Sequence, residues 1–236
     1  MNIGIVLAGG QGTRMGIADR PKQFIDVYGK PVVIHTLENF DIHPEIDAIA
    51  VVCVKEWQDD LKILIRKFEL NKVKWIIDGG KTRQESTYNA LDALKEILHE
   101  DDIVVIHDSA RPLITNRIIS DNIKGAKEFG AVDTVIPSTD TIVRSLDGSM
   151  ISNVPLRKEL YLGQTPQSFK FSIIKEAHDI AWSNNIDNAT DDCQLILNNG
   201  KEVHLIAGDK LNFKITTQED LLLLKSIVKL GKLERI

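Results

Sequence analysis

The sequence is poor in cysteine and has no long apolar run. Its 236 residues include two cysteines, Cys53 and Cys193, which lie far apart in the chain. Two isolated cysteines make neither a disulfide framework nor a zinc site. No apolar run approaches the roughly 18 to 20 residues that span a bilayer. The N-terminus has no charged leader and breaks into glycines by Gly9, which is not typical of a signal peptide. We therefore expect a cytoplasmic protein with no membrane partner.

An excess of positive charge is also missing. The chain has 29 Lys and Arg against 34 Asp and Glu, which gives a formal net charge of -5. Such a chain is a poor candidate for a general nucleic-acid binder, so we expect no nucleic-acid partner. Any cationic site for an anionic substrate must therefore be local.

Composition is that of an ordinary globular protein, with 43% hydrophobic and 27% charged residues. This excludes a disordered or fibrous chain. The length predicts a single domain over residues 1–236.

Short apolar, β-branched runs alternate with amphipathic stretches along the chain. We expect buried strands at 3–7, 49–54, 73–77, 103–106, 132–136 and 203–206. Helices are expected at 32–40, 56–68, 84–98, 116–129, 173–181 and 221–228, the last behind a capping box of Thr216 and Glu219. The alternation predicts an α/β fold: a Rossmann-like, mostly parallel sheet flanked by helices.

One segment breaks this rhythm. Extended runs at 141–144 and 150–154 flank Asp147-Gly148, which is a hairpin signal. We expect a protruding β-hairpin arm at about 138–163. Such an arm either contacts another subunit or forms a surface flap, and the pattern alone leaves both open.

The strongest chemical signal follows the first expected strand. There the chain reads LAGGQGTRMG (7–16), and PKQ follows at 21–23. Backbone N–H groups of a glycine-rich loop can approach phosphates, and Arg14 and Lys22 add two cations. The spacing is not the dinucleotide fingerprint, because Gly16 comes one residue too late after Gly12. We interpret the loop as a phosphate site; the alternative is a tight turn beside two solvated bases.

Other short segments accompany this loop: GGKTRQES (79–86), HDSARP (107–112), DT (140–141), QTPQSF (164–169), TDD (190–192) and NFKIT (212–216). In this order and across nearly the whole chain, they resemble the cytidylyltransferases that make CDP-activated polyols. The resemblance implies a fold of the nucleotide-diphospho-sugar transferase type. It also implies nucleotidyltransferase activity with CTP and a polyol phosphate as substrates and Mg²⁺ as cofactor.

The resemblance places the nucleotide between two glycine turns. Gly80, Arg83 and Ser86 would contact the cytosine and ribose, although 79–82 could also be a plain strand-to-helix turn. The full set of nucleotide-binding residues that it implies is Leu7, Ala8, Gly9, Gly10, Gly12, Gly80, Arg83, Ser86, Asp108 and Ser109.

Three cations are implied at the triphosphate, and we assign them the catalytic role: Arg14, Lys22 and Lys214. Without the resemblance, Lys214 would be taken for an ordinary exposed lysine. Asp108 ends an expected parallel strand, where open α/β sheets bind ligands. The resemblance gives it contact with the nucleotide, the acceptor or Mg²⁺, and it is the candidate metal ligand.

The acceptor site implied by the resemblance contains Asp108, Arg111, Thr141, Arg157 and Thr165. Thr141 and Arg157 lie in the arm and would come from the neighbouring subunit of a homodimer. Arg111 could instead pair structurally with Asp108. For Asp191-Asp192, a metal pair is possible, but a helix start is the simpler interpretation.

The implied reaction is attack by the acceptor phosphate on the α-phosphorus of CTP, with release of pyrophosphate. A phosphate monoester has a second pKa of about 6 and needs no general base at neutral pH. Catalysis would rest on positioning and electrostatic stabilisation.

Two acceptors are considered. YLGQTPQSF (161–169) and Ser109 look more like the branch that uses D-ribitol 5-phosphate, for teichoic-acid or related glycans, and Gly163 could make room for a longer polyol. We expect this acceptor. The alternative is 2-C-methyl-D-erythritol 4-phosphate, of isoprenoid synthesis, and the alternative of another class is a non-catalytic nucleotide-binding protein. The interpretation as a metal-dependent glycosyltransferase is weakened, because the chain has no Asp-x-Asp motif.

Overall fold

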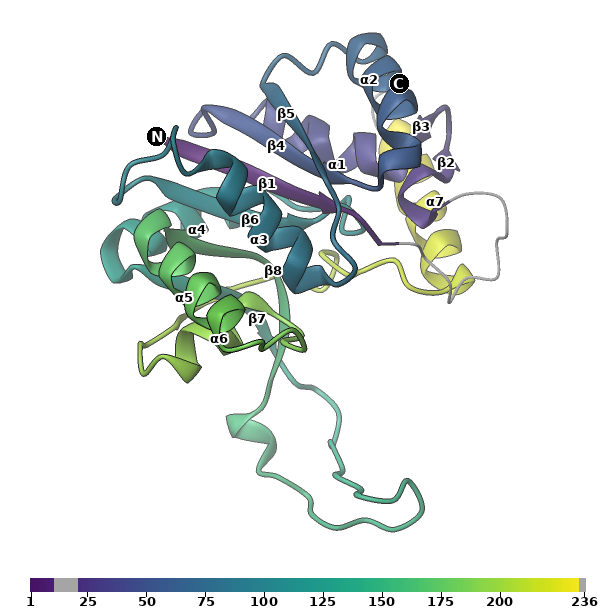
Figure 1. Ribbon diagram of the computed structural model, residues 1–236. Helices are drawn as coiled ribbons and strands as arrows, with labels where there is room; N and C mark the ends of the chain where they lie inside the picture. The colour runs from purple at the N-terminus through teal and green to yellow at the C-terminus, as the bar shows by residue number, and fades with distance from the viewer. Residues whose placement is uncertain (11–20, 234–236) are drawn as a thin grey trace.

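A seven-stranded sheet forms the centre of the computed structural model, which describes residues 1–10 and 21–233. The strand order is β5-β4-β1-β6-β8-β7-β9 (Figure 1). Among these strands, β8 alone runs antiparallel to its neighbours, so the sheet is mostly parallel, as predicted. The strands are β1 (Asn2–Ala8), β4 (Ala48–Cys53), β5 (Val73–Asp78), β6 (Ile103–Asp108), β7 (Ala131–Pro137), β8 (Tyr161–Lys170) and β9 (His204–Ala207).

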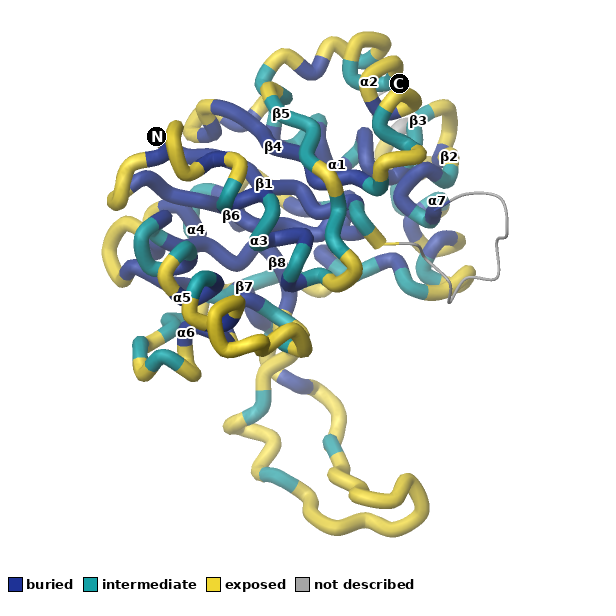
Figure 2. Tube along the Cα trace, in the orientation of Figure 1, coloured by how far each residue is buried: buried dark blue, intermediate teal, exposed yellow. Residues whose placement is uncertain are grey.

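All six strands predicted from apolar runs are present, within one or two residues of the expected ends. The central strands β1, β4 and β6 are buried along their whole length, which is why they read as continuous apolar runs. Figure 2 shows them as the dark centre of the molecule. At Gly4 of β1 a Cβ atom would lie 2.7 Å from Cδ1 of Phe40, so glycine lets a helix pack closely on the sheet.

The seventh strand, β8, was not predicted. Its sequence, YLGQTPQSFK, contains a proline and several polar residues, which argue against a central strand. The structure accommodates Pro166 where the pairing with β7 shifts register, between the pairs Asp133–Gln167 and Val135–Gly163. The strand therefore depends on its two neighbours rather than on a local pattern.

Helices cover both faces of the sheet. On one face, α3 (Arg83–Leu94), α5 (Phe171–Ser183) and α6 (Asp192–Asn198) pack in one apolar cluster. On the other, α1 (Val32–Asp41), α2 (Gln58–Lys67) and α4 (Asn116–Phe129) pack in a second. The predicted helices are all present, although the one expected over 84–98 ends at Leu94.

A smaller cluster joins α7 (Gln218–Leu233) to the two-stranded ribbon of β2 (Asp26–Val27) and β3 (Lys30–Pro31). The capping box of α7 lies one residue later than predicted. Thr217 Oγ1 accepts from the Asp220 N–H at 3.3 Å, and the Asp220 carboxylate accepts from the Thr217 N–H at 2.8 Å. Aspartate thus takes the place expected for Glu219.

Residues 138–160 leave the sheet between β7 and β8 as a long protruding segment, which we call the arm (Figure 1). Asp147 Oδ1 accepts from the N–H groups of Ser149 and Met150, and Gly148 has a φ of +75°, so the predicted turn is present. The two extended runs expected beside it are not confirmed, because the arm has one isolated bridge, Arg144–Asn153, in place of a ladder. The last predicted arm residues, 161–163, belong to β8.

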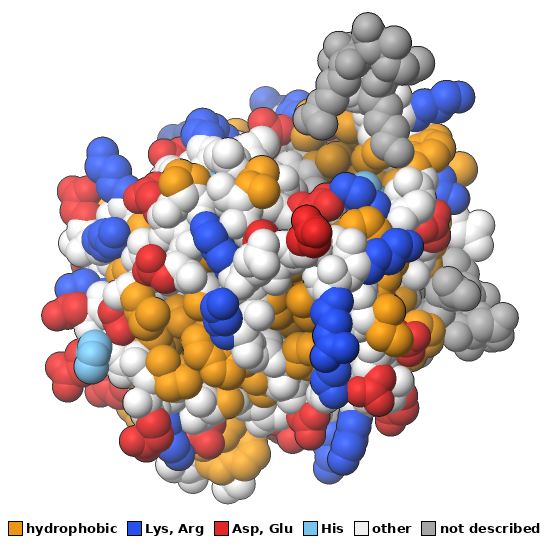
Figure 3. All heavy atoms as spheres, turned by 90° about the horizontal axis from the view of Figure 1, so that it is seen from above, with side chains coloured by type: hydrophobic (Ala, Val, Ile, Leu, Met, Phe, Trp, Pro, Cys, Tyr) orange, Lys and Arg blue, Asp and Glu red, His pale blue; other side chains and the backbone are white. Residues whose placement is uncertain are grey.

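Over the described ranges, no helix is both long and apolar enough to cross a membrane. On the face seen in Figure 3, acidic and basic side chains are intermingled, with no broad area of one sign. This face therefore offers no concentrated positive charge for an anionic substrate.

Candidate active site

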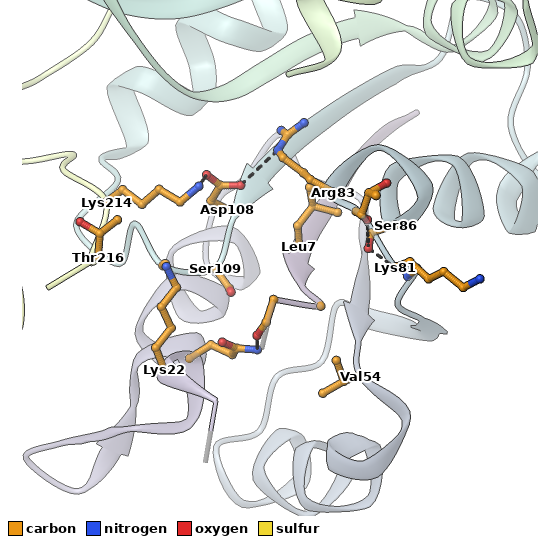
Figure 4. Close-up of a pocket in the computed structure, with 16 residues that line it drawn as sticks. Leu7, Lys22, Val54, Lys81, Arg83, Ser86, Asp108, Ser109, Lys214 and Thr216 are labelled. Atoms are coloured by element: carbon orange, nitrogen blue, oxygen red, sulfur yellow. Dashed lines mark hydrogen bonds and ion pairs between the residues drawn. The ribbon is translucent and has the colours of Figure 1, made fainter. Parts of the chain in front are cut away.

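A cavity of about 570 Å³ lies at the C-terminal ends of β1, β5 and β6, where open α/β sheets bind ligands. Many of the predicted nucleotide and catalytic residues line it: Leu7, Gly9, Gly10, Lys22, Gly80, Arg83, Ser86, Asp108, Ser109 and Lys214 (Figure 4). The sequence did not single out the other lining residues, Gln23, Val54, Lys81, Thr82, Ala110 and Thr216. All of these except Val54 lie inside the quoted motifs, and the motifs were the feature of the sequence that could have identified them.

Two glycine turns form one wall. A Cβ atom on Gly79 would lie 3.3 Å from Cα of Gly9, and one on Gly9 would lie 3.1 Å from Oγ of Ser86. At Gly80 a Cβ would lie 2.4 Å from Cγ of Glu85. The two loops approach this closely only because they lack side chains, and their backbone therefore faces the cavity.

The first turn of α3 continues this wall. Thr82 Oγ1 accepts from the Glu85 N–H at 3.0 Å and caps the helix. Ser86 Oγ accepts from the Gly80 N–H at 3.0 Å and donates to the Thr82 carbonyl at 2.9 Å. Ser86 thus holds the glycine turn against the helix start, whose N–H groups suit an anion.

The opposite wall comes from η2 (Lys22–Phe24) and from the segment before α7. Gln23 Nε2 donates to the carbonyls of Ala8 (2.6 Å) and Gly10 (2.9 Å), which fixes the end of β1. Lys22 Nζ donates to the Ile215 carbonyl at 2.9 Å. Ala8, predicted to contact the nucleotide, is buried and does not line the cavity. It contributes indirectly, because its carbonyl accepts the hydrogen bond that holds Gln23.

Asp108 is the charged centre of the cavity floor. Its Oδ2 lies 2.8 Å from Lys214 Nζ and 3.9 Å from Arg111 Nε, and its Oδ1 lies 3.6 Å from Arg83 Nε. Burial alone would raise the pKa of Asp108, but Arg83, Lys214 and Arg111 together lower that pKa well below its usual range. The carboxylate is therefore ionised, and the cations around it outnumber it.

A buried chain of hydrogen bonds holds Asp108 from behind. Its N–H donates to Thr165 Oγ1 at 3.1 Å, and that hydroxyl lies 3.0 Å from His107 Nδ1. His107 Nε2 lies 3.1 Å from the Arg111 carbonyl, which can only accept, so Nε2 carries the proton. Burial lowers the pKa of His107 to about 4, so the ring is neutral and packed.

Arg83 has a second carboxylate partner that the sequence did not assign. Its Nη1 lies 2.7 Å from Asp192 Oδ2, and Asp192 Oδ1 lies 3.0 Å from His178 Nε2. Asp192 and His178 are both 1% exposed. Burial opposes ionisation of Asp192, but Arg83 and then His178 lower its pKa to about 2. Asp191 caps α6 by accepting from the Gln194 N–H at 2.9 Å, which agrees with the helix-start interpretation.

Apart from Asp108, the predicted acceptor residues lie outside the cavity lining. Arg111 and Thr165 are buried behind Asp108, with Arg111 Nη1 donating to the Asn212 carbonyl at 2.8 Å. Thr141 lies in the arm, as does Arg157, whose Nη1 donates to the Thr139 carbonyl at 3.3 Å. Gly12 and Arg14 lie outside the described residues. The assigned roles of all these residues stay predictions.

In the described part of the chain, no group of three or more His, Cys, Asp or Glu side chains is placed to hold a metal ion. Among the described residues that line the cavity, Asp108 is the only one with a carboxylate. This donor set fits a magnesium ion that takes one protein carboxylate and completes its shell with phosphate oxygens and water.

Comparisons with known proteins agree with this arrangement. A family model for 2-C-methyl-D-erythritol 4-phosphate cytidylyltransferase (IspD) matches residues 3–230. The structure is similar to 4-diphosphocytidyl-2C-methyl-D-erythritol synthase from Anaerococcus prevotii, at 28% identity and a TM-score of 0.82, covering 97% of this chain and 96% of that one. The 2-C-methyl-D-erythritol 4-phosphate cytidylyltransferase of Francisella tularensis matches at 28% identity and 0.79, covering 95% and 98%. The enzyme of that name from Thermus thermophilus matches at 27% and 0.73, covering 95% and 98%.

Proposed function

Because the chain belongs to the 2-C-methyl-D-erythritol 4-phosphate cytidylyltransferase family and is thus a nucleotidyltransferase, we propose how its cavity works. The cavity binds CTP, and the enzyme joins CMP to the phosphate of a polyol phosphate and releases pyrophosphate. One observation carries the proposal: Lys22, Arg83 and Lys214, from three separate parts of the chain, meet in one cavity beside two glycine turns.

The nucleotide lies between the two walls of this cavity. The glycine turns leave room for a planar base and its ribose beside the start of α3, whose positive end suits an anion. Lys22 and Lys214 stand on the opposite wall, where the triphosphate places its charge (Figure 4). Arg14 is the third cation that the family resemblance implies.

No side chain has to remove a proton for the reaction. The acceptor phosphate is largely a dianion at neutral pH, since its second pKa is about 6. His107 is not available as a base, because it is fully buried and its two ring nitrogens face Thr165 and the Arg111 carbonyl. The cations Lys22 and Lys214 offset the charge that develops on the α-phosphate and on the leaving pyrophosphate.

Asp108 is the residue that would hold Mg²⁺. A magnesium ion held there would supply a Lewis acid for the phosphate charge. Because Asp108 Oδ2 lies 2.8 Å from Lys214 Nζ, this chain would place its lysine and the metal on the same carboxylate. The lysine then remains beside the phosphates and orients them.

For the acceptor, we propose 2-C-methyl-D-erythritol 4-phosphate as the first candidate. The matching family model and the structures from Francisella tularensis and Thermus thermophilus carry that substrate in their names, at 28% and 27% identity for the two structures. The name of the Anaerococcus prevotii protein contains 4-diphosphocytidyl-2C-methyl-D-erythritol. They favour this alternative over the acceptor expected from the sequence. The expectation that Gly163 makes room for a longer polyol is also weakened, because Gly163 pairs with Val135 in the sheet and does not line the cavity.

D-Ribitol 5-phosphate remains the second candidate. Ser109, one of the features that suggested it, does line the cavity, beside Asp108. The string at 161–169 forms β8, which carries Thr165 behind the same aspartate. In either case the resemblance implies that Arg157 and Thr141 of a second subunit reach the acceptor phosphate from the arm. Thr165 and Arg111 would contribute from this subunit, beside Asp108.

The test is pyrophosphate release with CTP and Mg²⁺, comparing kcat/KM for the two acceptors under identical conditions. Faster turnover of the methylerythritol phosphate supports the first candidate, and faster turnover of the ribitol phosphate replaces it with the second. CTP binding without turnover of any polyol phosphate would favour a non-catalytic nucleotide-binding protein. A parallel preparation from cells that do not express the protein is the control for contaminating enzymes.

A further inference from the structure

Lys214 lies in a segment without regular secondary structure, in which a local turn at 209–212 lies before the lysine. Residues 208–217, between β9 and α7, contain no helix or strand. Even so, Lys214 Nζ lies 2.8 Å from Asp108 Oδ2. The position of this lysine must therefore come from contacts between the segment and the rest of the protein.

Ile215 N–H donates to the Ala110 carbonyl at 2.9 Å and the Asn212 carbonyl accepts from Arg111 Nη1 at 2.8 Å, and Gln164 of β8 makes three further contacts of this kind. Its Nε2 donates to the Asp209 carbonyl at 2.8 Å, and its Oε1 accepts from the Asp209 N–H at 3.3 Å. The same Oε1 accepts from Asn212 Nδ2 at 3.2 Å. Gln164 is 6% exposed and does not line the cavity, so its amide is committed to residues 209 and 212.

Thr165, the next residue, holds the other partner of the ion pair. Its carbonyl accepts from Asn212 Nδ2 at 2.8 Å, while its hydroxyl accepts from the Asp108 N–H at 3.1 Å. Two consecutive residues of β8 therefore reach both Asp108 and the segment that carries Lys214. Asn212 is fully buried between them.

Gly208 leaves the space that the Gln164 amide fills. A Cβ atom at this position would lie 2.4 Å from Gln164 Oε1 and 3.1 Å from Cγ2 of Thr134. Any side chain at 208 would therefore push the amide away from Asp209. This gives an independent way to disturb the same contact.

We propose that Gln164 is a positioning residue for the transfer of CMP: its amide sets the 208–217 segment so that Lys214 lies against Asp108. The proposal rests on the role given above to Lys214. A side-chain amide bonded to both backbone groups of one residue acts like a neighbouring strand and fixes the segment along its length. Without it, Lys214 moves relative to the phosphates, and misplacement by about 1 Å can cost about 100-fold in rate.

The test is a double-mutant cycle between Gln164→Met and Lys214→Ala, read as kcat/KM for CTP. Methionine keeps the volume and removes the hydrogen bonds. We expect Gln164→Met to lower kcat/KM by about 10- to 100-fold and Lys214→Ala by about 100-fold or more. In the double variant, Gln164→Met should cost less than about threefold beyond Lys214→Ala, because the lysine it positions is gone.

The cycle separates positioning from damage to the fold. A purely structural role would lower activity by the same factor with or without Lys214, so additive losses would overturn the proposal. Wild-type turnover in Gln164→Met would also overturn it. Gly208→Ala should reproduce both the loss of kcat/KM and its non-additivity with Lys214→Ala. This variant replaces Gln164→Met in the cycle if Gln164→Met does not fold.

Asn2→Leu is the matched control. Asn2 is also a buried amide that donates to a loop carbonyl, that of Glu45 at 2.7 Å, but it lies at the end of β1 remote from the cavity. Its kcat/KM should stay near the wild-type value. If Lys214→Ala alone retains wild-type activity, the proposed function of Lys214 fails together with this proposal. A large loss in Lys214→Ala with an additive cycle refutes only the role of Gln164.

Discussion

Replacing Asp192 with asparagine removes the negative charge that holds Arg83 at the cavity. The Asp192 side chain is 1% exposed, and it lies 2.7 Å from Arg83 Nη1. Removing one partner of a buried ion pair typically costs about 3–5 kcal/mol, because the other charge stays buried. Arg83 is 22% exposed and keeps Asp108 at 3.6 Å, so we expect the lower end, about 3 kcal/mol.

The pKa of Asp192 leads to a similar figure. Although burial opposes it, the pairing with Arg83 and His178 lowers this pKa from 3.8 to about 2. That depression is equivalent to roughly 2–3 kcal/mol. Because the folded pKa lies below the unfolded one, the stabilisation is fully present above about pH 4 and is lost as the pH falls towards about 2.

Thermal unfolding at pH 7, followed by circular dichroism, measures the effect. For a protein of this size, about 3 kcal/mol corresponds to a fall in Tm of roughly 6–12 °C. Asp101→Asn is the control, since Asp101 pairs with Lys170 at 2.8 Å but is 85% exposed. It should cost less than about 1 kcal/mol.

A double variant identifies the cause. If the loss comes from the uncompensated guanidinium of Arg83, adding Arg83→Met to Asp192→Asn should recover part of the stability. The reasoning is refuted if Asp192→Asn melts within about 2 °C of the wild type, or no lower than Asp101→Asn.

Three further predictions concern other sites. Lys22→Ala should lower turnover by about 100-fold in the pyrophosphate assay while the protein remains folded; near-wild-type turnover would remove Lys22 from the mechanism. Burial, and then Asp191, raise the pKa of Asp133 to about 7, so the unfolded chain releases this proton at lower pH than the folded one. The wild-type free energy of unfolding should therefore fall from about pH 4 to about pH 7 in urea titrations, and Asp133→Asn should gain stability relative to it over that range; an unchanged difference would contradict the shift. Leu146 and Met150 of the arm are 78% and 71% exposed. If the arms join two subunits in a homodimer, the double variant Leu146→Asp with Met150→Asp should sediment as a monomer. A wild-type protein that already sediments as a monomer would exclude that dimer.

Much of the fold could be predicted because its signals are local. Buried parallel strands appear in the sequence as apolar runs, and the cap of α3 at Thr82 follows directly from its residue type. The strand β8 could not be predicted in this way. Its proline is accepted where β7 shifts register, and that irregularity is a property of the neighbouring strand.

The same division holds for the site. The glycine turns, Lys22, Asp108 and Lys214 were found from short motifs, and they do line one cavity. The amino-acid sequence by itself thus determined which groups are available and which strand ends carry them. The arm was recognised as an interruption, but its lack of a ladder was not, because pairing there depends on a partner strand.

Only the tertiary structure decided how these groups are held. Arg83 meets Asp192 across 109 residues, Thr165 meets Asp108 across 57, and Gln164 meets Asp209 across 45. Polar contacts between such distant positions leave no periodic pattern in the sequence, because each depends on two strands or loops arriving at the same place. Local motifs therefore supply the chemical groups of the site, whereas long-range hydrogen bonds and ion pairs set its geometry.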